Sequence, residues 1–314
     1  MNIGIVDLGT NTCTLIIGHL DNSKNLQIIK KESLVVKLGT KEHYKNRNIT
    51  AKGINKIIDV LLQHLATAKK FNISSLHIYS TAAIREAENK LEIQSKIESN
   101  PAFKMVILKG EEEALLTTNA VQLAAEGLKG PLLTMDIGGG SNEFVIIKNS
   151  EIIWSQSFKT GMARILQTFP FEDKIDNTII DKVNNHFIEK HKELWLAIEK
   201  YQPQILIGSS GAFDTYVDLI KHHQPISHLQ KRNQIEISDF HSLHNTLIES
   251  TKKERKEMKG MTPIRELMIV YASMLTNLVL KKSNINQMYQ TGYALAEGAL
   301  FEKQNSDHGQ NISY

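Results

Sequence analysis

Residues 135–144, "MDIGGGSNEF", decide how the central part of the chain folds. The apolar run 131–136 ends in an acid, Asp136, and a second apolar run begins directly after Glu143. Gly, Ser and Asn between two such runs predict a tight turn joining two strands. Glycine is favoured where another group must touch the backbone. Gly138, Gly139 and Gly140 therefore predict that a ligand approaches this turn closely.

A similar arrangement stands at the start of the chain. The apolar run 2–7, "NIGIVD", ends in Asp7 and is followed by the turn "LGTNT" and by two more apolar runs, 13–20 and 25–38. The recurrence of an acid-ended strand and a tight turn at Asp7 and Asp136 predicts two domains of similar architecture. Strands that feed helices place both in the α/β class. We expect the ligand to bind between these halves, where the turns face each other.

The remaining segments alternate between helical and extended patterns. Apolar residues recur at helical spacing over 51–71, for example at Ile54, Ile57 and Leu61. The other expected helices are 82–99, 110–128, helical segments within 175–201, and one starting near Ala212. Strands are expected at 76–81, 103–108, 143–161 (two strands with an Asn-Ser turn), 204–210 and 287–292, and most of 238–304 is expected to be helical.

Composition excludes several classes of protein. A hydrophobic fraction of 41% and a charged fraction of 23% are those of a globular protein. The single cysteine, Cys13, cannot form an internal disulfide. The sequence shows neither a signal peptide nor an apolar run long enough for a membrane span, so we expect no membrane association and a cytoplasmic location. Aromatic residues make up 6% and do not alternate with basic ones, which argues against nucleic-acid binding.

Four turns share small residues and backbone N–H groups that can bind an anion. Two are the tight turns 7–12 and 136–142, and two join a strand to a helix, at 80–85 ("STAAIR") and 208–213 ("GSSGAF"). Successive N–H groups in a turn, or at the N-terminus of a helix, form a concave site for phosphate. Any one of these turns could be an ordinary connection, but four together favour a phosphate ligand.

Acidic residues beside these turns indicate a metal ion. Asp7, Asp136 and Glu143 would repel a polyphosphate unless a cation lay between them. Mg²⁺ commonly binds one or two carboxylates together with phosphate oxygens and water. The residues therefore predict a magnesium–phosphate site. The alternative is that each acid is only a strand-end or exposed strand residue.

Two further residues are candidates for the chemistry. Glu112 and Glu113 are adjacent in "GEEEALL", so on a helix they point in different directions and only one can serve as a base for an attacking water. Arg85 could hold a phosphoryl group through paired hydrogen bonds. The alternatives are that the acidic run only complements a helix dipole, and that Arg85 is a surface charge.

The turns and acids together resemble the exopolyphosphatase / guanosine pentaphosphate phosphatase family of the actin–sugar kinase–Hsp70 superfamily. The matching stretches, in order, are "VDLGTNT" (6–12), "STAAIR" (80–85), "GEEEA" (110–114), "DIGGGSNE" (136–143) and "GSSG" (208–211). The resemblance implies two ribonuclease H-like (actin-like ATPase) domains with a cleft between them. Domain I would comprise 1–124, with a C-terminal helix at about 299–314 packing back on it, and domain II would comprise 125–298.

The resemblance also implies an activity: Mg²⁺-dependent release of terminal phosphate from inorganic polyphosphate or guanosine pentaphosphate (pppGpp). By motif position, Glu113 resembles the residue that activates water, and Arg85 the arginine that holds the terminal phosphoryl group. Asp136 and Glu143 resemble the acids that position metal and water, and Asp7 is a third candidate metal ligand. The phosphate-binding residues would be Asn11, Thr12, Gly138, Gly139, Gly140, Ser141, Gly208, Ser209, Ser210 and Gly211.

The chain departs from the family pattern at several positions. Leu115 and Ala296 stand where the family has arginine, and Leu267 and Ala272 where it has an acid and a glycine. We also expect no C-terminal extension of the kind with which longer members hold long chains. The leading hypothesis is therefore an exopolyphosphatase acting on short chains, which could form a homodimer. The alternatives are a pppGpp 5′-phosphohydrolase, or a regulatory protein that binds polyphosphate or (p)ppGpp with little turnover. A sugar kinase is disfavoured, since we find no adenosine motif.

Overall fold

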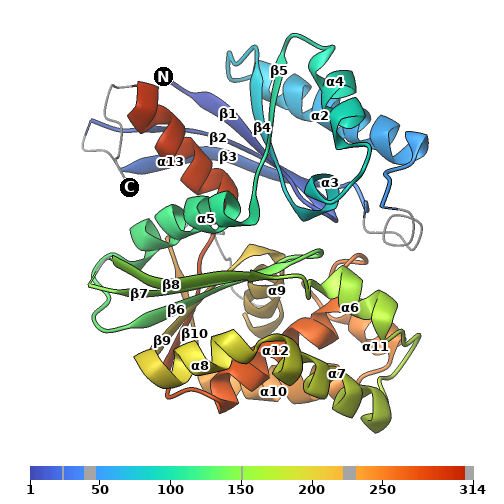
Figure 1. The fold of residues 1–314 in the computed structure, drawn as a ribbon, viewed down its shortest axis with the longest axis vertical. Coiled ribbons are helices and arrows are strands. Elements are labelled where there is room, and N and C mark those ends of the chain that lie inside the picture. Colours follow the sequence, from blue (N-terminus) through green and yellow to red (C-terminus); the bar gives the residue numbers. More distant parts are fainter. Residues whose placement is uncertain (23–24, 39–46, 150, 222–230, 308–314) are drawn as a thin grey trace. The chain divides into compact units, whose positions relative to one another are not determined.

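The computed structural model describes residues 1–22, 25–38, 47–149, 151–221 and 231–307 (Figure 1). The chain divides into two compact units, the first formed by Met1–Ala120 together with the residues from Ala294 onward, the second by Val121–Tyr293. The divisions expected from the sequence lay at 124/125 and 298/299, and the part of the expected last helix at 308–314 lies outside the described residues.

The first unit is built on a five-stranded sheet of order β3-β2-β1-β4-β5. The first three strands form an antiparallel meander, and β4 and β5 run parallel to β1. The strands are β1 (Ile3–Leu8), β2 (Thr12–Leu20), β3 (Leu26–Val35), β4 (Leu76–Ser80) and β5 (Phe103–Ile107).

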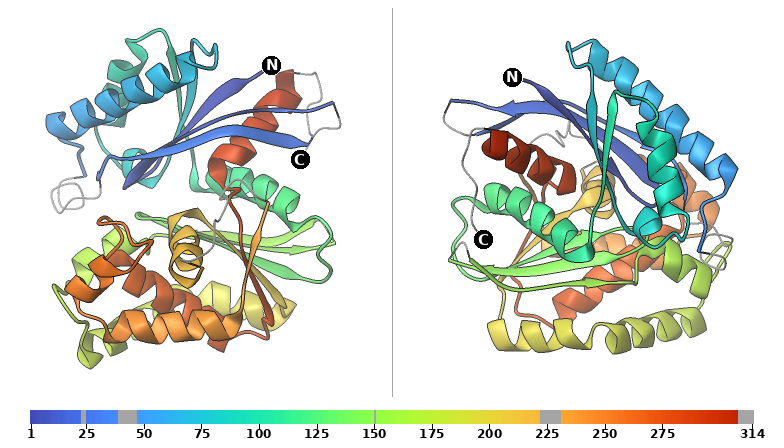
Figure 2. Two further views of the ribbon diagram at one scale, coloured as in Figure 1. Left: turned by 180° about the vertical axis from the view of Figure 1, so that it is seen from behind. Right: turned by 45° about the horizontal axis from the view of Figure 1, so that its top comes forward.

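Helices cover both faces of this sheet (Figure 2). Helix α2 (Ala51–Lys69) begins at Thr50, whose side chain accepts a hydrogen bond from the amide of Gly53. Its buried face belongs to the same apolar cluster as Val6 and Leu15. Side chains alternate along a strand, so the neighbouring Ile5 lies on the opposite face, and α13 (Leu295–Asp307) contacts β1 and β2.

The single helix expected at 82–99 is wrong. The structure has a one-turn helix α3 (Ala82–Arg85) and a separate α4 (Lys90–Glu98). Asn89 breaks the run, because its side-chain amide donates to the carbonyl of Ile49 at 2.9 Å while its side-chain oxygen accepts from the amide of Ile49 at 3.1 Å. This pairing with a segment distant in sequence overrides the local helical preference of 82–99.

The second unit repeats the topology with one addition. Its sheet has the order β10-β11-β9-β6-β7-β8, in which β6, β7 and β8 form an antiparallel meander while β9 and β11 run parallel to β6. A short antiparallel strand, β10, is added at the far edge. The bounds are β6 (Leu132–Ile137), β7 (Asn142–Lys148), β8 (Glu151–Phe158), β9 (Ile205–Ser209), β10 (Asn233–Ile235) and β11 (Gln287–Gln290).

The two faces of the second sheet bury different clusters. Leu133, Met135 and Phe144 belong to a large core formed with the helices of this unit. Leu132 and Val145, on the other face, pack with Val121 of α5 (Gly110–Ala125), the helix within which the chain passes from the first unit to the second. The remaining helices are α6 (Met162–Thr168), α7 (Asn177–Lys190), α8 (Lys192–Tyr201), α9 (Ser210–Ile220), α10 (Ile237–Glu249), α11 (Lys252–Glu257) and α12 (Met268–Lys281).

The predicted α/β class and repeated strand pattern are confirmed, but the sequence analysis missed α6 and β10. It expected an extended segment up to Gly161 and helices only from residue 175, whereas α6 begins at Met162. Both missed elements are short, and the first amides of α6 bond to the turn at 138–140. Because this contact joins segments about 20 residues apart, the hydrophobic pattern of the sequence around 162–168 does not indicate the helix. Within the described residues, no helix is long and apolar enough to cross a membrane.

Candidate active site

The glycine turn forms the tip of the β6–β7 hairpin, as its sequence predicted. Ile137 and Asn142 are the last paired residues of the two strands, and the amide of Gly138 donates to the carbonyl of Ser141 at 3.0 Å. A Cβ at Gly138 would lie 2.7 Å from the Ser141 oxygen. The turn therefore requires glycine at this position for steric reasons within the hairpin itself.

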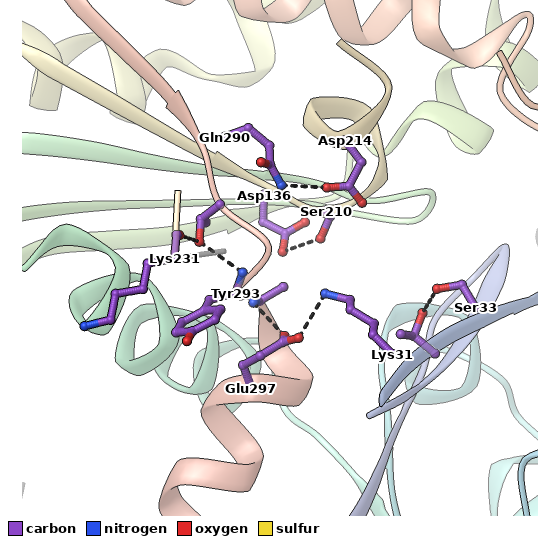
Figure 3. A network of polar contacts seen from close by, with 12 residues as sticks. Lys31, Ser33, Asp136, Ser210, Asp214, Lys231, Gln290, Tyr293 and Glu297 are labelled. Carbon is purple, nitrogen blue, oxygen red and sulfur yellow. Dashed lines mark hydrogen bonds and ion pairs between the residues drawn. The ribbon is translucent and has the colours of Figure 1, made fainter. Parts of the chain in front are cut away.

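Asp136 and Glu143 face each other directly across this hairpin. They are register partners on β6 and β7, so their side chains leave the same face of the sheet. Both are buried. Asp136 accepts hydrogen bonds from Ser210 at 2.8 Å (Figure 3) and from Ser209 at 3.2 Å. Glu143 accepts one from Ser157 at 2.7 Å. Each pairing uses hydroxyl donors, which stabilise a carboxylate without neutralising its charge.

The turn from β9 into α9 adds serines to this site. Ser210 has φ +65°, a conformation that costs energy for a residue other than glycine. Its hydroxyl is one of the two that reach Asp136. The glycines of the same turn have packing neighbours: a Cβ at Gly208 would fall 1.9 Å from the ring of Phe213, and one at Gly211 would fall 2.2 Å from a guanidinium nitrogen of Arg265.

Arg265 is a residue of this site that the sequence analysis did not single out. Its guanidinium lies against the first turn of α9 at Gly211 and donates to Thr215 at 2.8 Å. A positive charge at the N-terminus of a helix is unfavourable on its own, because the helix dipole already concentrates positive potential there. An anion bound at the same place would offset that repulsion. The "TPIREL" segment offered no periodic signal that could have identified it.

Asn142, by contrast, points into the core. Its amide donates to the carbonyl and hydroxyl oxygens of Thr160 at 2.8 and 3.1 Å. The Thr160 hydroxyl pairs at 3.0 Å with Nε2 of His191, whose Nδ1 donates to the carbonyl of Phe187 at 2.9 Å. Burial lowers the pKa of His191 to about 4, so the ring is neutral and Nε2 accepts. This network anchors the base of the glycine turn to the core.

The first unit contains the corresponding turn. Asp7 pairs with Thr14 in the β1–β2 hairpin, and the amide of Gly9 donates to the carbonyl of Thr12 at 2.9 Å. The corresponding bond in the second unit is the one that the amide of Gly138 donates to the carbonyl of Ser141. Asn11 and Thr12, the phosphate-binding candidates of this unit, occupy the end of the turn.

Glu113 is the buried member of the acidic run at the start of α5. Glu111 and Glu112 are exposed, and Glu112 accepts a hydrogen bond from the amide of Lys109 at 2.8 Å, which caps the helix. Glu113 instead pairs with Arg85, whose Nη1 lies 2.5 Å from the carboxylate and 3.2 Å from the carbonyl of Leu108. The two candidate bases therefore differ in their contacts: Glu112 caps the helix, and Glu113 forms an ion pair with Arg85.

The donor set of these sites suits a hard cation. The acidic side chains beside the turns are Asp136 and Glu143 in the second unit and Asp7 in the first, and all of them offer carboxylate oxygens. Among the residues that the structure describes, no cluster of three or more His, Cys, Asp or Glu side chains forms a closed metal cage. Mg²⁺ needs no such cage, because it keeps water and phosphate oxygens as ligands.

Position 296, where the resemblance implies an arginine, is filled by the buried Ala296 in the first turn of α13. Its neighbour Glu297 is also buried and forms an ion pair with Lys31 at 2.9 Å (Figure 3). The same carboxylate accepts the amide of Ala294 at 2.8 Å. These contacts attach the start of α13 to strand β3.

The repeated unit, a meander followed by parallel strands with acids at the first hairpin, defines an actin-like two-domain α/β protein. Residues 16–307 match the model of the Ppx/GppA phosphatase family. The chain belongs to that family, and the predicted resemblance is confirmed.

Similar proteins include solved and curated members. A crystal structure of an exopolyphosphatase from Cytophaga hutchinsonii is 30% identical, with a TM-score of 0.91 over 100% of both chains. Exopolyphosphatase 1 of Mycobacterium tuberculosis is 22% identical over 98% of this chain and 89% of its own length. A guanosine-5′-triphosphate,3′-diphosphate pyrophosphatase of Vibrio cholerae is 24% identical over 95% of this chain and 58% of its own length.

Proposed function

We propose that the protein is a phosphoanhydride hydrolase that releases terminal orthophosphate from inorganic polyphosphate, with a preference for short chains. The observation that carries this proposal is the pair of buried carboxylates, Asp136 and Glu143, opposite each other beside a glycine turn. Mg²⁺ commonly binds one or two carboxylates together with phosphate oxygens, so two facing carboxylates beside a turn suited to phosphate fit a magnesium–phosphate site. Membership of a phosphatase family and the 30% identical exopolyphosphatase support the same activity.

Mg²⁺ is the cation that this donor set fits. Asp136 and Glu143 would hold it, with Asp7 as a further ligand. When bound, the ion supplies positive charge that offsets the charge of the phosphate oxygens during transfer. The serines at 209 and 210 keep Asp136 oriented through the two hydroxyl bonds described above.

Glu113 is the proposed base. Its carboxylate takes a proton from a water molecule while the water oxygen attacks the terminal phosphorus. The bridging P–O bond breaks, and its electrons leave with the shortened chain. Arg85 now pairs with Glu113, and a phosphoryl dianion competes for the same guanidinium. When the guanidinium of Arg85 pairs with the phosphoryl group instead of with Glu113, the carboxylate of Glu113 becomes available to accept the proton.

The glycine turn and the serine turn are the proposed phosphate cradle. It comprises Gly138–Ser141 and Gly208–Gly211 in the second unit, with Asn11 and Thr12 in the first. Arg265 joins this set, because its cation lies at the start of α9. A short chain is preferred because leucine and alanine at positions 115 and 296 supply no cationic contacts for a long polyanion.

The second candidate function is hydrolysis of the 5′ terminal phosphate of pppGpp, favoured by the similarity to the Vibrio cholerae protein. The deciding experiment compares orthophosphate release from tripolyphosphate, long-chain polyphosphate, pppGpp and ATP at fixed Mg²⁺. Fastest release from tripolyphosphate supports the proposal, and fastest release from pppGpp replaces it with the second candidate. Tight binding of these compounds without release would identify a regulatory protein and overturn the hydrolase assignment.

A homodimer and a cytoplasmic location are further parts of the proposal. The homodimer is tested by sedimentation equilibrium of the purified protein, in which a mass near the 35.4 kDa of one chain would contradict it. The location is tested by fractionation of the cells that produce the protein.

A further inference from the structure

The carbonyl groups of the glycine turn are all bonded from one side, by the start of helix α6. The residues concerned are the three glycines at 138–140. Their oxygens accept, in order, the amide of Met162 at 2.9 Å, the amide of Ala163 at 2.9 Å, and the amide of Gly161 at 3.3 Å. The oxygen of residue 140 also accepts Nε of Arg164 at 3.1 Å. The first amides of α6 are therefore used by the turn itself.

This arrangement fixes the direction of the N–H groups of the same peptides. A trans peptide is planar, and its carbonyl oxygen and N–H point in opposite directions. The described chain contains no cis peptide bond. With the three carbonyls held toward α6, the N–H groups of Gly139, Gly140 and Ser141 point away from it. They form a run of successive donors of the kind that binds phosphate oxygens.

The turn of the first unit is held in the same way by a different element. The carbonyl of Thr10 accepts the amide of Leu38 at 2.7 Å, and the carbonyl of Asn11 accepts the amides of Val36 and Lys37 at 2.9 and 3.1 Å. The N–H groups of Asn11 and Thr12 therefore point away from the segment 36–38. In one unit the start of a helix holds the turn, and in the other the segment that follows strand β3 holds it. The same peptide orientation results, which indicates that both units require this orientation.

Gly161 permits the close approach of α6. A Cβ at this residue would lie 2.4 Å from the carbonyl carbon of Gly140 and 2.5 Å from the carbon and oxygen of Gly139. Any side chain here would push the helix away from the turn. Arg164, three residues farther along the chain, supplies a side-chain hydrogen bond to the carbonyl of Gly140.

We propose that Arg164 and Gly161 are positioning residues of the phosphate cradle: they hold the carbonyls of 138–140 back so that the N–H groups face the phosphoryl oxygens. This inference rests on the proposed function, because it assigns the orientation of that cradle to α6. Arg164 acts through the peptide that joins residues 140 and 141, and its Nε–H is the group that matters.

Two variants of Arg164 test this role. In Arg164→Gln, the side-chain nitrogen is bonded to Cδ as the arginine Nε is, so a donor remains while the charge is lost. In Arg164→Met, the length remains and the donor is lost. We expect Arg164→Gln to bind tripolyphosphate nearly as the unaltered protein does. We expect Arg164→Met to bind about ten- to hundredfold more weakly, the range of one hydrogen bond in which one partner is charged.

Binding is measured by calorimetry, and kcat and KM by orthophosphate release, with thermal melting as the check on folding. The matched control is Lys182→Met, which removes a cation at an exposed position of helix α7 and should change none of these values. Equal loss in Arg164→Gln and Arg164→Met would show that the guanidinium charge itself contacts the ligand and would overturn the positioning role. Unchanged binding in both variants would overturn it as well.

A second variant keeps the test informative if the methionine variant folds poorly. Gly161→Ala should weaken tripolyphosphate binding while the far-ultraviolet spectrum is retained, and unchanged binding contradicts the inference. Turnover by the unaltered protein tests the proposed function separately. The ranking of the variants by binding remains decisive even if that turnover is absent.

Discussion

Replacing Glu113 by glutamine should remove the proposed general base and leave the fold intact. The glutamine oxygen can still accept from Nη1 of Arg85, which keeps its second bond to the carbonyl of Leu108 at 3.2 Å. The fold should therefore be retained. Only the ability to take a proton is lost, and a general base contributes roughly 10²- to 10⁴-fold to turnover. That range corresponds to about 3–5 kcal/mol of barrier.

Substrate affinity should respond differently from turnover. In Glu113→Gln, Arg85 no longer faces a carboxylate and so binds the terminal phosphoryl group without that competition. We therefore expect kcat for tripolyphosphate to fall by about two to four orders of magnitude, while KM does not rise. Orthophosphate release at saturating Mg²⁺ gives both constants, and calorimetry gives the affinity directly.

Glu112 provides the matched control, because it is the adjacent acid in the same helix. It is exposed, and its carboxylate accepts a hydrogen bond from the amide of Lys109 at the start of the helix. Glu112→Gln should leave kcat unchanged and lower the melting temperature slightly. The assignment of Glu113 as the base is refuted if its variant keeps kcat within about tenfold of the original, below the usual contribution of such a base, or if both variants lose turnover equally.

Three further predictions follow from other parts of the structure. Asp136→Asn should raise the Mg²⁺ concentration needed for half-maximal turnover, with partial recovery at high Mg²⁺; an unchanged requirement contradicts its role as a ligand. Gly298→Ala places a Cβ 1.7 Å from the carbonyl oxygen of Leu116 and should destabilise the fold by about 1–3 kcal/mol, measured by urea unfolding; unaltered stability contradicts this packing. His191 has a folded pKa of about 4 against 6.5 in the unfolded chain, so only the unfolded state takes up its proton as the pH falls through this window. The free energy of unfolding should therefore drop by about 2 kcal/mol between pH 7.5 and 5, and His191→Gln should flatten that part of the urea-unfolding profile.

Much of the architecture could be predicted from local sequence. Strands β1, β2, β6 and β7 and the turns between them were placed correctly, because apolar runs interrupted by Gly, Ser and Asn determine a hairpin within a few residues. The repeat of this pattern at Asp7 and Asp136 predicted two similar sheets. The motif at 136–143 carried the family resemblance, which the match over residues 16–307 confirms.

Other features could not be read locally. The break at Asn89 depends on its pairing with Ile49, and the short helix α6 depends on its bonds to the glycine turn. Arg265 gave no pattern at all, since its significance comes from its position against the first turn of α9. The site residues predicted from the motifs remain proposals, which the variants above test.

The sequence by itself determined where the turns and their acids lie along the chain, because a hairpin and its register are set by neighbouring residues. Only the tertiary structure decided which acid of the run at 111–113 is buried, and which way the peptides of the glycine turn face. Glu113 is selected by Arg85, and the turn is oriented by Gly161 and Arg164 of α6. Both depend on hydrogen bonds between segments distant in sequence, and such bonds form only once the chain has folded.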